Sequence, residues 1–166
     1  MKDLTLLSIA KENELKKNDI EIVIVGGSAV ELYSFGKYLS GDIDIVSPAS
    51  YSIGEKLESL GFFKRGKNWI SEELGLFMDI PASALAGDPA RVREVAIGDG
   101  FSVKVIGVED LIVDRLNACV HWKFETDCEW ASYLIRKFEK EIDLDYLMKR
   151  AAEDKVDAKL NELRSK

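Results

Sequence analysis

β-branched residues dominate positions 20–25, and the run stops at Gly26, Gly27 and Ser28. A strand that is covered on both faces has this pattern. Residues 29–33 follow in good helix order, so we predict a buried strand that passes through a glycine turn into a helix. Ser28 can cap that helix, and free amide groups at its start would favour a phosphate. A plain strand-to-helix turn with a serine cap explains the same residues.

Polar and apolar positions alternate in the next strand, which we predict over residues 42–46. Residues i and i+2 of a strand point the same way, so Asp42 and Asp44 share one face and the two isoleucines share the other. Neighbouring carboxylates repel each other unless a cation or solvent relieves them. A solvent-facing edge strand explains the pair equally well. Lys37, the only charge in the preceding loop, can reach a phosphate or remain a solvated loop lysine.

Short apolar segments separated by glycine turns follow a predicted helix over residues 51–60, which Gly61 ends. The strands expected there are residues 62–65, 68–71 and 75–80, followed by a hairpin of residues 92–97 and 101–106. Asp79 is the one charge in the strand of residues 75–80. A charge in an otherwise buried strand needs a partner or a metal. A strand-end residue that caps the following turn is the alternative for Asp79.

Helical periodicity marks both ends of the chain. The helices expected there are residues 4–17, 108–119, 125–139, 144–152 and 156–163. Arg115 falls on an apolar stripe, so it can point inward at an acidic or phosphate group, or snorkel to the surface. We expect residues 1–107 to form a core with an N-terminal helix. Residues 108–166 would be a helical part packed on that core in a single compact unit.

Composition narrows the class of protein. The 166 residues are 46% hydrophobic and 32% charged, which allows a real core and excludes disorder. The net charge of −7 argues against broad non-specific nucleic-acid binding, but allows a small nucleotide or an RNA end on a local basic rim. No apolar run approaches the roughly 18 residues of a membrane helix, and the N-terminus lacks a signal-peptide core. We therefore expect a cytoplasmic protein with no membrane segment.

Cys119 and Cys128 are too few for a disulfide framework, so we expect free thiols in the core. Together with His121, the single histidine, they would need a fourth ligand at unusual spacing to hold zinc. A zinc site is therefore the weaker explanation of these residues.

The order of the motifs suggests chemistry at phosphorus. Asp42, Asp44 and Asp79 on neighbouring strands could hold two divalent cations about 3.5–4 Å apart, the arrangement used for in-line displacement at phosphorus. Carboxylates without histidine suit Mg²⁺ or Mn²⁺. The phosphates would meet the amides of Gly26 and Gly27. This is a layout for phosphoryl or nucleotidyl transfer.

The same motifs resemble the nucleotidyltransferase superfamily of DNA polymerase beta. Its pattern is an apolar run with Gly-[Gly/Ser], a helix, Asp-x-[Asp/Glu], and a later apolar-Asp-apolar strand. The match covers residues 20 to 80, with Gly26, Gly27, Ser28, Asp42, Asp44 and Asp79 at the matching positions. Residues 108–116 and 142–147 look more loosely like helices of small prokaryotic members, some of which are abortive-infection toxins that modify RNA. The resemblance implies an α+β fold, a mixed sheet flanked by helices with a helical C-terminal part.

The resemblance also implies an activity. A nucleoside monophosphate would pass from an NTP to an acceptor hydroxyl of RNA, protein or a small molecule, with release of pyrophosphate. Asp42 and Asp44 would bind the metals, and Asp79 would complete the acceptor-side metal and help to deprotonate the hydroxyl. The residues assigned to the nucleotide are Gly26, Gly27, Ser28, Lys37 and Arg115. The alternatives are an inactive nucleotide-binding or toxin–antitoxin partner protein, with an antitoxin or a second copy as its partner, and a solvated acidic strand without a site.

Overall fold

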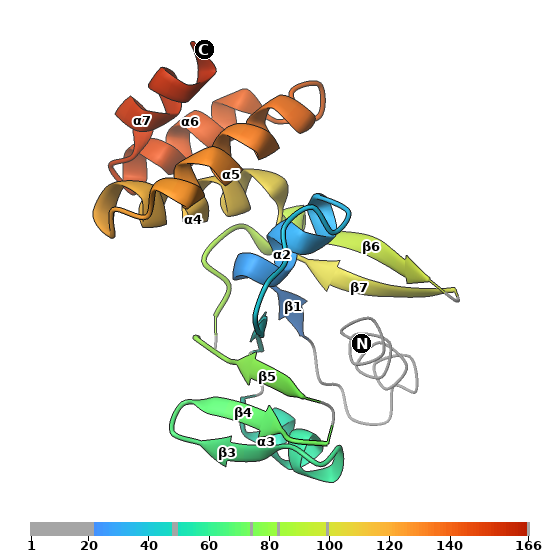
Figure 1. Cartoon of the computed structure of the whole chain (residues 1–166). Coiled ribbons are helices and arrows are strands. Elements are labelled where there is room, and N and C mark those ends of the chain that lie inside the picture. The colour runs from blue at the N-terminus through green and yellow to red at the C-terminus, as the bar shows by residue number, and fades with distance from the viewer. Residues whose placement is uncertain (1–21, 48–49, 74, 83, 99, 166) are drawn as a thin grey trace. The chain divides into compact units, whose positions relative to one another are not determined.

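The computed structural model describes residues 22–47, 50–73, 75–82, 84–98 and 100–165 (Figure 1). It divides into two compact units, Met1–Ile106 and Gly107–Lys166. The first is built on a sheet and the second consists of helices. The helix predicted over residues 4–17 lies outside the described residues.

The described part of the first unit contains a seven-stranded sheet in the order β3-β4-β5-β2-β1-β7-β6. Its strands are β1 (Val23–Ile24), β2 (Ile43–Val46), β3 (Phe63–Arg65), β4 (Asn68–Ser71), β5 (Leu76–Asp79), β6 (Arg93–Gly98) and β7 (Phe101–Val105). β1 pairs with β7, and β2 with β5, in parallel, while the other neighbours are antiparallel. This mixed sheet confirms the predicted α+β class.

β1 lies within the predicted apolar run, whose first two residues, 20 and 21, lie outside the described part of the chain. Ile24 is fully buried, because β1 has a strand on each side and both of its faces are covered. The pairing continues past the strand, since the Val25 amide donates to the Asp44 carbonyl oxygen at 3.0 Å. The chain then turns at Gly26, whose φ is +55°, into α2 (Gly26–Tyr33). The Tyr33 hydroxyl secures the end of α2 by donating to the Ile106 carbonyl oxygen at 2.7 Å.

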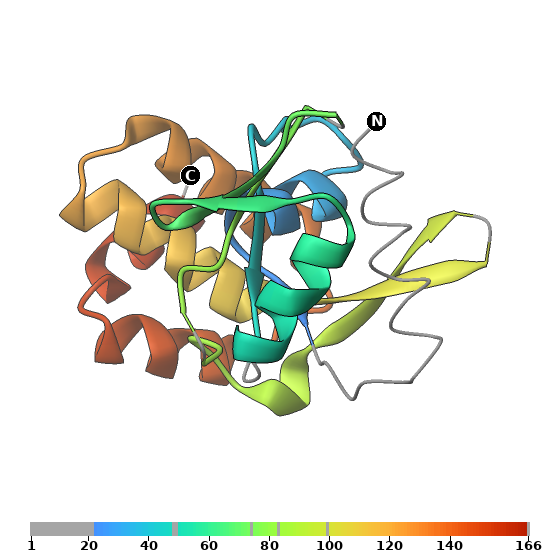
Figure 2. The same ribbon diagram turned by 90° about the horizontal axis from the view of Figure 1, so that it is seen from below.

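The helix α3 (Ser50–Ser59) covers one face of the strands β3 to β5 (Figure 2). A methyl group added at Gly54 would lie 3.2 Å from the Trp69 ring, so helix and strand are in close contact there. Gly61 follows α3 with φ +82°, which confirms the predicted glycine end of this helix. The short 3₁₀ helix η1 (Pro89–Arg91) precedes β6.

The second unit contains four helices among its described residues. They are α4 (Val108–His121), α5 (Glu125–Lys137), α6 (Leu144–Glu153) and α7 (Asp157–Arg164). Leucines fill their core: Leu111, Leu116, Leu134, Leu147 and Leu160 are almost fully buried. None of the helices in the described residues combines the length and the apolar character that a membrane crossing requires.

The prediction of free core thiols is wrong. Cys119 in α4 and Cys128 in α5 form a disulfide, with their Cα atoms 5.0 Å apart. The reason is topological, because the two antiparallel helices of a hairpin bring the end of one beside the start of the next. Both sulfurs are committed to this bond, so the zinc alternative also fails.

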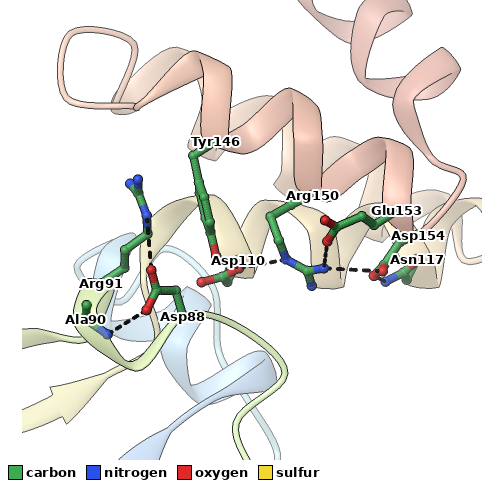
Figure 3. A network of polar contacts seen from close by, with 9 residues as sticks. All are labelled: Asp88, Ala90, Arg91, Asp110, Asn117, Tyr146, Arg150, Glu153 and Asp154. Atoms are coloured by element: carbon green, nitrogen blue, oxygen red, sulfur yellow. Dashed lines mark hydrogen bonds and ion pairs between the residues drawn. The ribbon is translucent and has the colours of Figure 1, made fainter.

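A buried carboxylate organises the polar contacts of the second unit (Figure 3). The Asp110 side chain is fully buried and accepts from the Tyr146 hydroxyl at 2.8 Å and from Arg150 Nε at 3.3 Å. Arg150 Nη1 also donates to Glu153 at 2.8 Å, and this hydrogen bond raises the pKa of Arg150 further above its usual value. A buried carboxylate with two donors is stabilised by them, whereas the same group without a partner would be very costly.

Candidate active site

Two of the predicted carboxylates lie side by side. β2 and β5 are parallel neighbours, and Asp44 is the register partner of Asp79. Partners in register project from the same face of a sheet, so both carboxylates stand on one face. Asp42 lies one residue before β2, where its Oδ1 accepts from Ser40 Oγ at 3.3 Å. The strand order thus joins two motifs that are 35 residues apart in the sequence, residue 44 and residue 79.

The glycine turn holds Asp44 in place. Gly27 N donates to Asp44 Oδ2 at 3.0 Å, at the start of α2 where the helix dipole favours a negative charge. A Cβ atom added at Gly26 would lie 2.7 Å from the same oxygen, so only glycine allows this approach. The sequence pattern predicts that these amides bind a phosphate. In the structure, one of them binds the carboxylate that was predicted to bind metal.

Ser28 does not cap α2. The helix begins two residues earlier, at Gly26, and its N-cap residue is Val25. The Ser28 hydroxyl instead donates to the Asp42 carbonyl oxygen at 2.8 Å and accepts from the Asp44 amide at 3.2 Å. This buried serine therefore ties α2 to the start of β2 and helps to fix both aspartates.

The loop between α2 and β2 supplies two residues that sequence reasoning did not assign to the site. Ser40 Oγ donates to the Asp42 carbonyl oxygen at 2.8 Å. The Tyr38 ring lies so close to the turn that a Cβ atom added at Gly27 would be 3.2 Å from its hydroxyl oxygen. No periodicity marks these residues, and the short spacing between the two motifs is the only signal for them. Lys37 is exposed in the same loop.

Asp79 has an unsatisfied oxygen. Its Oδ1 is buried and has no hydrogen-bond partner among the described residues. On the other side of β5 its register partner is Asn68, whose Oδ1 is buried and unpartnered in the same way. Lys67 Nζ lies 3.9 Å from Asp79 Oδ2. A buried acceptor without a donor is unfavourable, so these oxygens mark a place for a cation or a proton donor. Sequence reasoning missed Asn68 because only the strand register brings it beside Asp79.

The oxygen donors suit a hard divalent cation such as Mg²⁺ or Mn²⁺. In the part of the chain that the structure describes, no three His, Cys, Asp or Glu side chains are grouped closely enough to hold an ion by themselves. Mg²⁺ commonly uses only one or two protein carboxylates and completes its shell with substrate phosphates and water. The donor set therefore fits a cation that is shared with a polyphosphate.

Arg115 belongs to the second unit and points at acidic groups. Its Nη1 donates to Asp127 Oδ1 at 2.8 Å and its Nη2 to Asp114 Oδ2 at 2.5 Å. The guanidinium side chain is only 15% exposed. An acidic residue and a phosphate were both possible targets for this side chain, and its described contacts are with the acidic residues Asp114 and Asp127.

The chain is similar to two solved structures. One is a crystal structure of ANT(2")-Ia in complex with adenylyl-2"-tobramycin, at 17% sequence identity and a TM-score of 0.56, covering 99% of this chain and 98% of that one. The other is a solution structure of the antibiotic-resistance factor ANT(2'')-Ia, at 17% identity and a TM-score of 0.47, covering 81% and 87%. No protein-family model matches the sequence, and no curated protein does. The first likeness is one of fold and confirms the nucleotidyltransferase-like α+β architecture.

Proposed function

We propose that this protein is a metal-dependent nucleotidyltransferase that moves a nucleoside monophosphate from an NTP to an acceptor hydroxyl. One observation carries the proposal. Asp44 and Asp79 are paired in register on one face of the sheet, and the glycine turn at the start of α2 contacts the first of them. This places two carboxylates beside a helix N-terminus, a combination that suits a polyphosphate with its cations.

Each residue of the site has a proposed task. Asp42 and Asp44 would hold divalent cations together with the polyphosphate, and these cations would neutralise the negative charge that develops during the transfer. The acceptor oxygen attacks the α-phosphorus, the bond from this phosphorus to the bridging oxygen breaks, and pyrophosphate leaves. Asp79 would complete the ligands of the cation on the acceptor side, and it takes the proton of the acceptor hydroxyl. Gly26, Gly27 and Ser28 position Asp44 and the polyphosphate, with Lys37 as a further phosphate contact.

The test is transfer of label from the α-phosphate. ATP, CTP, GTP and UTP, each labelled at that position, are incubated with Mg²⁺ or Mn²⁺ and with RNA, protein or tobramycin as acceptor. We expect labelled product and pyrophosphate with at least one acceptor, and a loss of about 10²- to 10⁴-fold in Asp79→Asn, the range for a missing general base. Asp42→Asn and Asp44→Asn should be similarly inactive. Glu94→Gln, an exposed carboxylate of β6, is the matched control. If Asp42→Asn and Asp44→Asn match the wild type, the proposal fails.

A nucleotide-binding protein without turnover, for example a partner in a toxin–antitoxin pair, is the second candidate. Among the described residues no three His, Cys, Asp or Glu side chains are grouped closely enough to hold an ion by themselves, which favours nucleotide binding without metal-dependent turnover. Calorimetry separates the two functions. Tight NTP binding without any product supports the second candidate, and product formation excludes it.

A further inference from the structure

The sheet carries Asp79 on the face opposite α3. Trp69 contacts α3, and its register partner on β5, Met78, is fully buried on the same side. Because side chains alternate along a strand, the neighbouring residues project from the other face. Two rows of register partners result on that face: Phe63, Ile70 and Phe77 form one, and Arg65, Asn68 and Asp79 form the other.

The first row presents bare aromatic rings. Phe63 is 42% exposed and Phe77 is 46% exposed, whereas Ile70 between them is only 9% exposed. The two exposed phenylalanines flank Ile70, so the three side chains form one continuous apolar row, and a contiguous apolar surface of this kind can mark a binding site. Flat rings held on strands are also platforms on which planar groups stack.

The second row has a positive edge. Residues 62–71 contain three basic residues and no acidic residue, in a chain whose net charge is −7. Lys64 is the register partner of Trp69 and projects from the α3 face, so Arg65 and Lys67 supply the charge at this row. Lys67 reaches toward Asp79, and no ion pair of Arg65 is found among the described residues. The hairpin of β3 and β4 is thus a local basic rim beside a site that is otherwise acidic. A polyanion is attracted to this rim, and a polycation is repelled by it.

The two rows lie two residues apart along each strand, which is about 7 Å. A ligand that spans them must offer planar groups to one row and negative charges to the other. A single-stranded nucleic acid has both features, and its terminal hydroxyl can reach Asp79 at the end of the second row. Bases stacked on aromatic side chains and a backbone held by lysine and arginine are the usual contacts of such strands.

We propose that the acceptor is the end of a single-stranded nucleic acid, which lies on the sheet face formed by Phe63, Phe77, Arg65 and Lys67. This inference rests on the proposed nucleotidyl transfer and names the acceptor class for the same site. The two phenylalanine rings bind the terminal bases, and the side chains of Arg65 and Lys67 bind the backbone phosphates. The terminal hydroxyl then lies beside Asp79.

The test measures binding without NTP or divalent cation, by fluorescence anisotropy of labelled single-stranded 12-mers of RNA and of DNA. We expect Phe77→Ala to weaken binding about 5- to 150-fold, the range for one lost base–aromatic stack. The double variant Arg65→Gln, Lys67→Gln should flatten the slope of log K against log salt by about 1.4, at about 0.7 per lost phosphate contact. Phe124→Ala, which removes an exposed aromatic ring of the second unit, is the matched control. Thermal melts of all variants show that they are folded.

The outcomes separate this inference from the proposed function. Binding that depends on Phe77 with RNA or with DNA supports the inference, and the stronger of the two identifies the preferred sugar. Equal weakening by Phe124→Ala, or no binding of either strand, overturns it. Turnover on tobramycin but not on a nucleic acid would leave the proposed function standing and refute the inference. Phe77-dependent binding without turnover on any acceptor would refute the function and leave the binding face standing.

Discussion

Replacement of Gly26 by alanine tests the close contact on which the site is built. Gly26 has φ +55°, a conformation that alanine adopts only at a cost of about 1–2 kcal/mol. The new Cβ atom would also lie 2.7 Å from Asp44 Oδ2 and 2.9 Å from Asp44 Cγ. The carboxylate must therefore move away from the start of α2.

The movement has a second cost. Asp44 Oδ2 accepts from Gly27 N at 3.0 Å, and this hydrogen bond cannot survive the displacement. Hydrogen bonds to charged groups contribute about 1.5–3 kcal/mol. Together with the backbone term, Gly26→Ala should lower the free energy of unfolding by about 2.5–5 kcal/mol.

Gly61→Ala is the matched control. Gly61 has φ +82°, and a Cβ atom added there meets nothing within 4 Å. It should therefore lower the free energy of unfolding only by the backbone cost of about 1–2 kcal/mol. Urea unfolding followed by tryptophan fluorescence measures both variants. Equal destabilisation of the two would refute the claim that Asp44 packs against the turn.

Three further perturbations probe other parts of the structure. Asn68→Leu should weaken the binding of Mn²⁺ in the presence of NTP, because Asp79 loses a polar neighbour. Electron paramagnetic resonance measures the Mn²⁺ affinity, and an unchanged affinity would show that Asn68 has no part in the site. Arg150→Met should destabilise the protein by about 3–5 kcal/mol, because it leaves the Asp110 carboxylate buried without its cation. The matched change Lys159→Met breaks an ion pair at the surface and should cost under about 1 kcal/mol, so similar urea midpoints for the two would contradict the buried network. Reduction of the disulfide between α4 and α5 should cost about 2–3 kcal/mol from the entropy of its short loop, and an unfolding curve unaffected by reductant would refute this.

The order of strands and helices could be predicted because its signals are local. Alternation identified β2, the β-branched run identified β1, and the turn of residues 98–100 identified the hairpin of β6 and β7. The fold class followed from their sequence. The predicted bounds differ from the observed ones by a residue or two in most of the described elements.

The contacts within the candidate site could not be predicted from local sequence patterns. Serine is a preferred helix cap, so Ser28 was predicted to cap α2. Its hydroxyl instead joins peptides of β2 that are 14 and 16 residues away, a partner choice that no local pattern encodes. Asn68 became part of the site only through the register of β4 with β5. Counting cysteines could not show that a helix hairpin would bring Cys119 to Cys128.

The central claim is that Asp44, Asp79 and the glycine turn form a site for a metal-bound nucleoside triphosphate. Isothermal titration with the four α,β-methylene NTPs, which cannot release pyrophosphate, tests it most directly. We predict that wild type and Glu94→Gln bind at least one of them in Mg²⁺, that EDTA abolishes this binding, and that Asp44→Asn and Asp79→Asn weaken it strongly. Binding that is equally tight in EDTA, or unchanged in Asp44→Asn, would contradict the account.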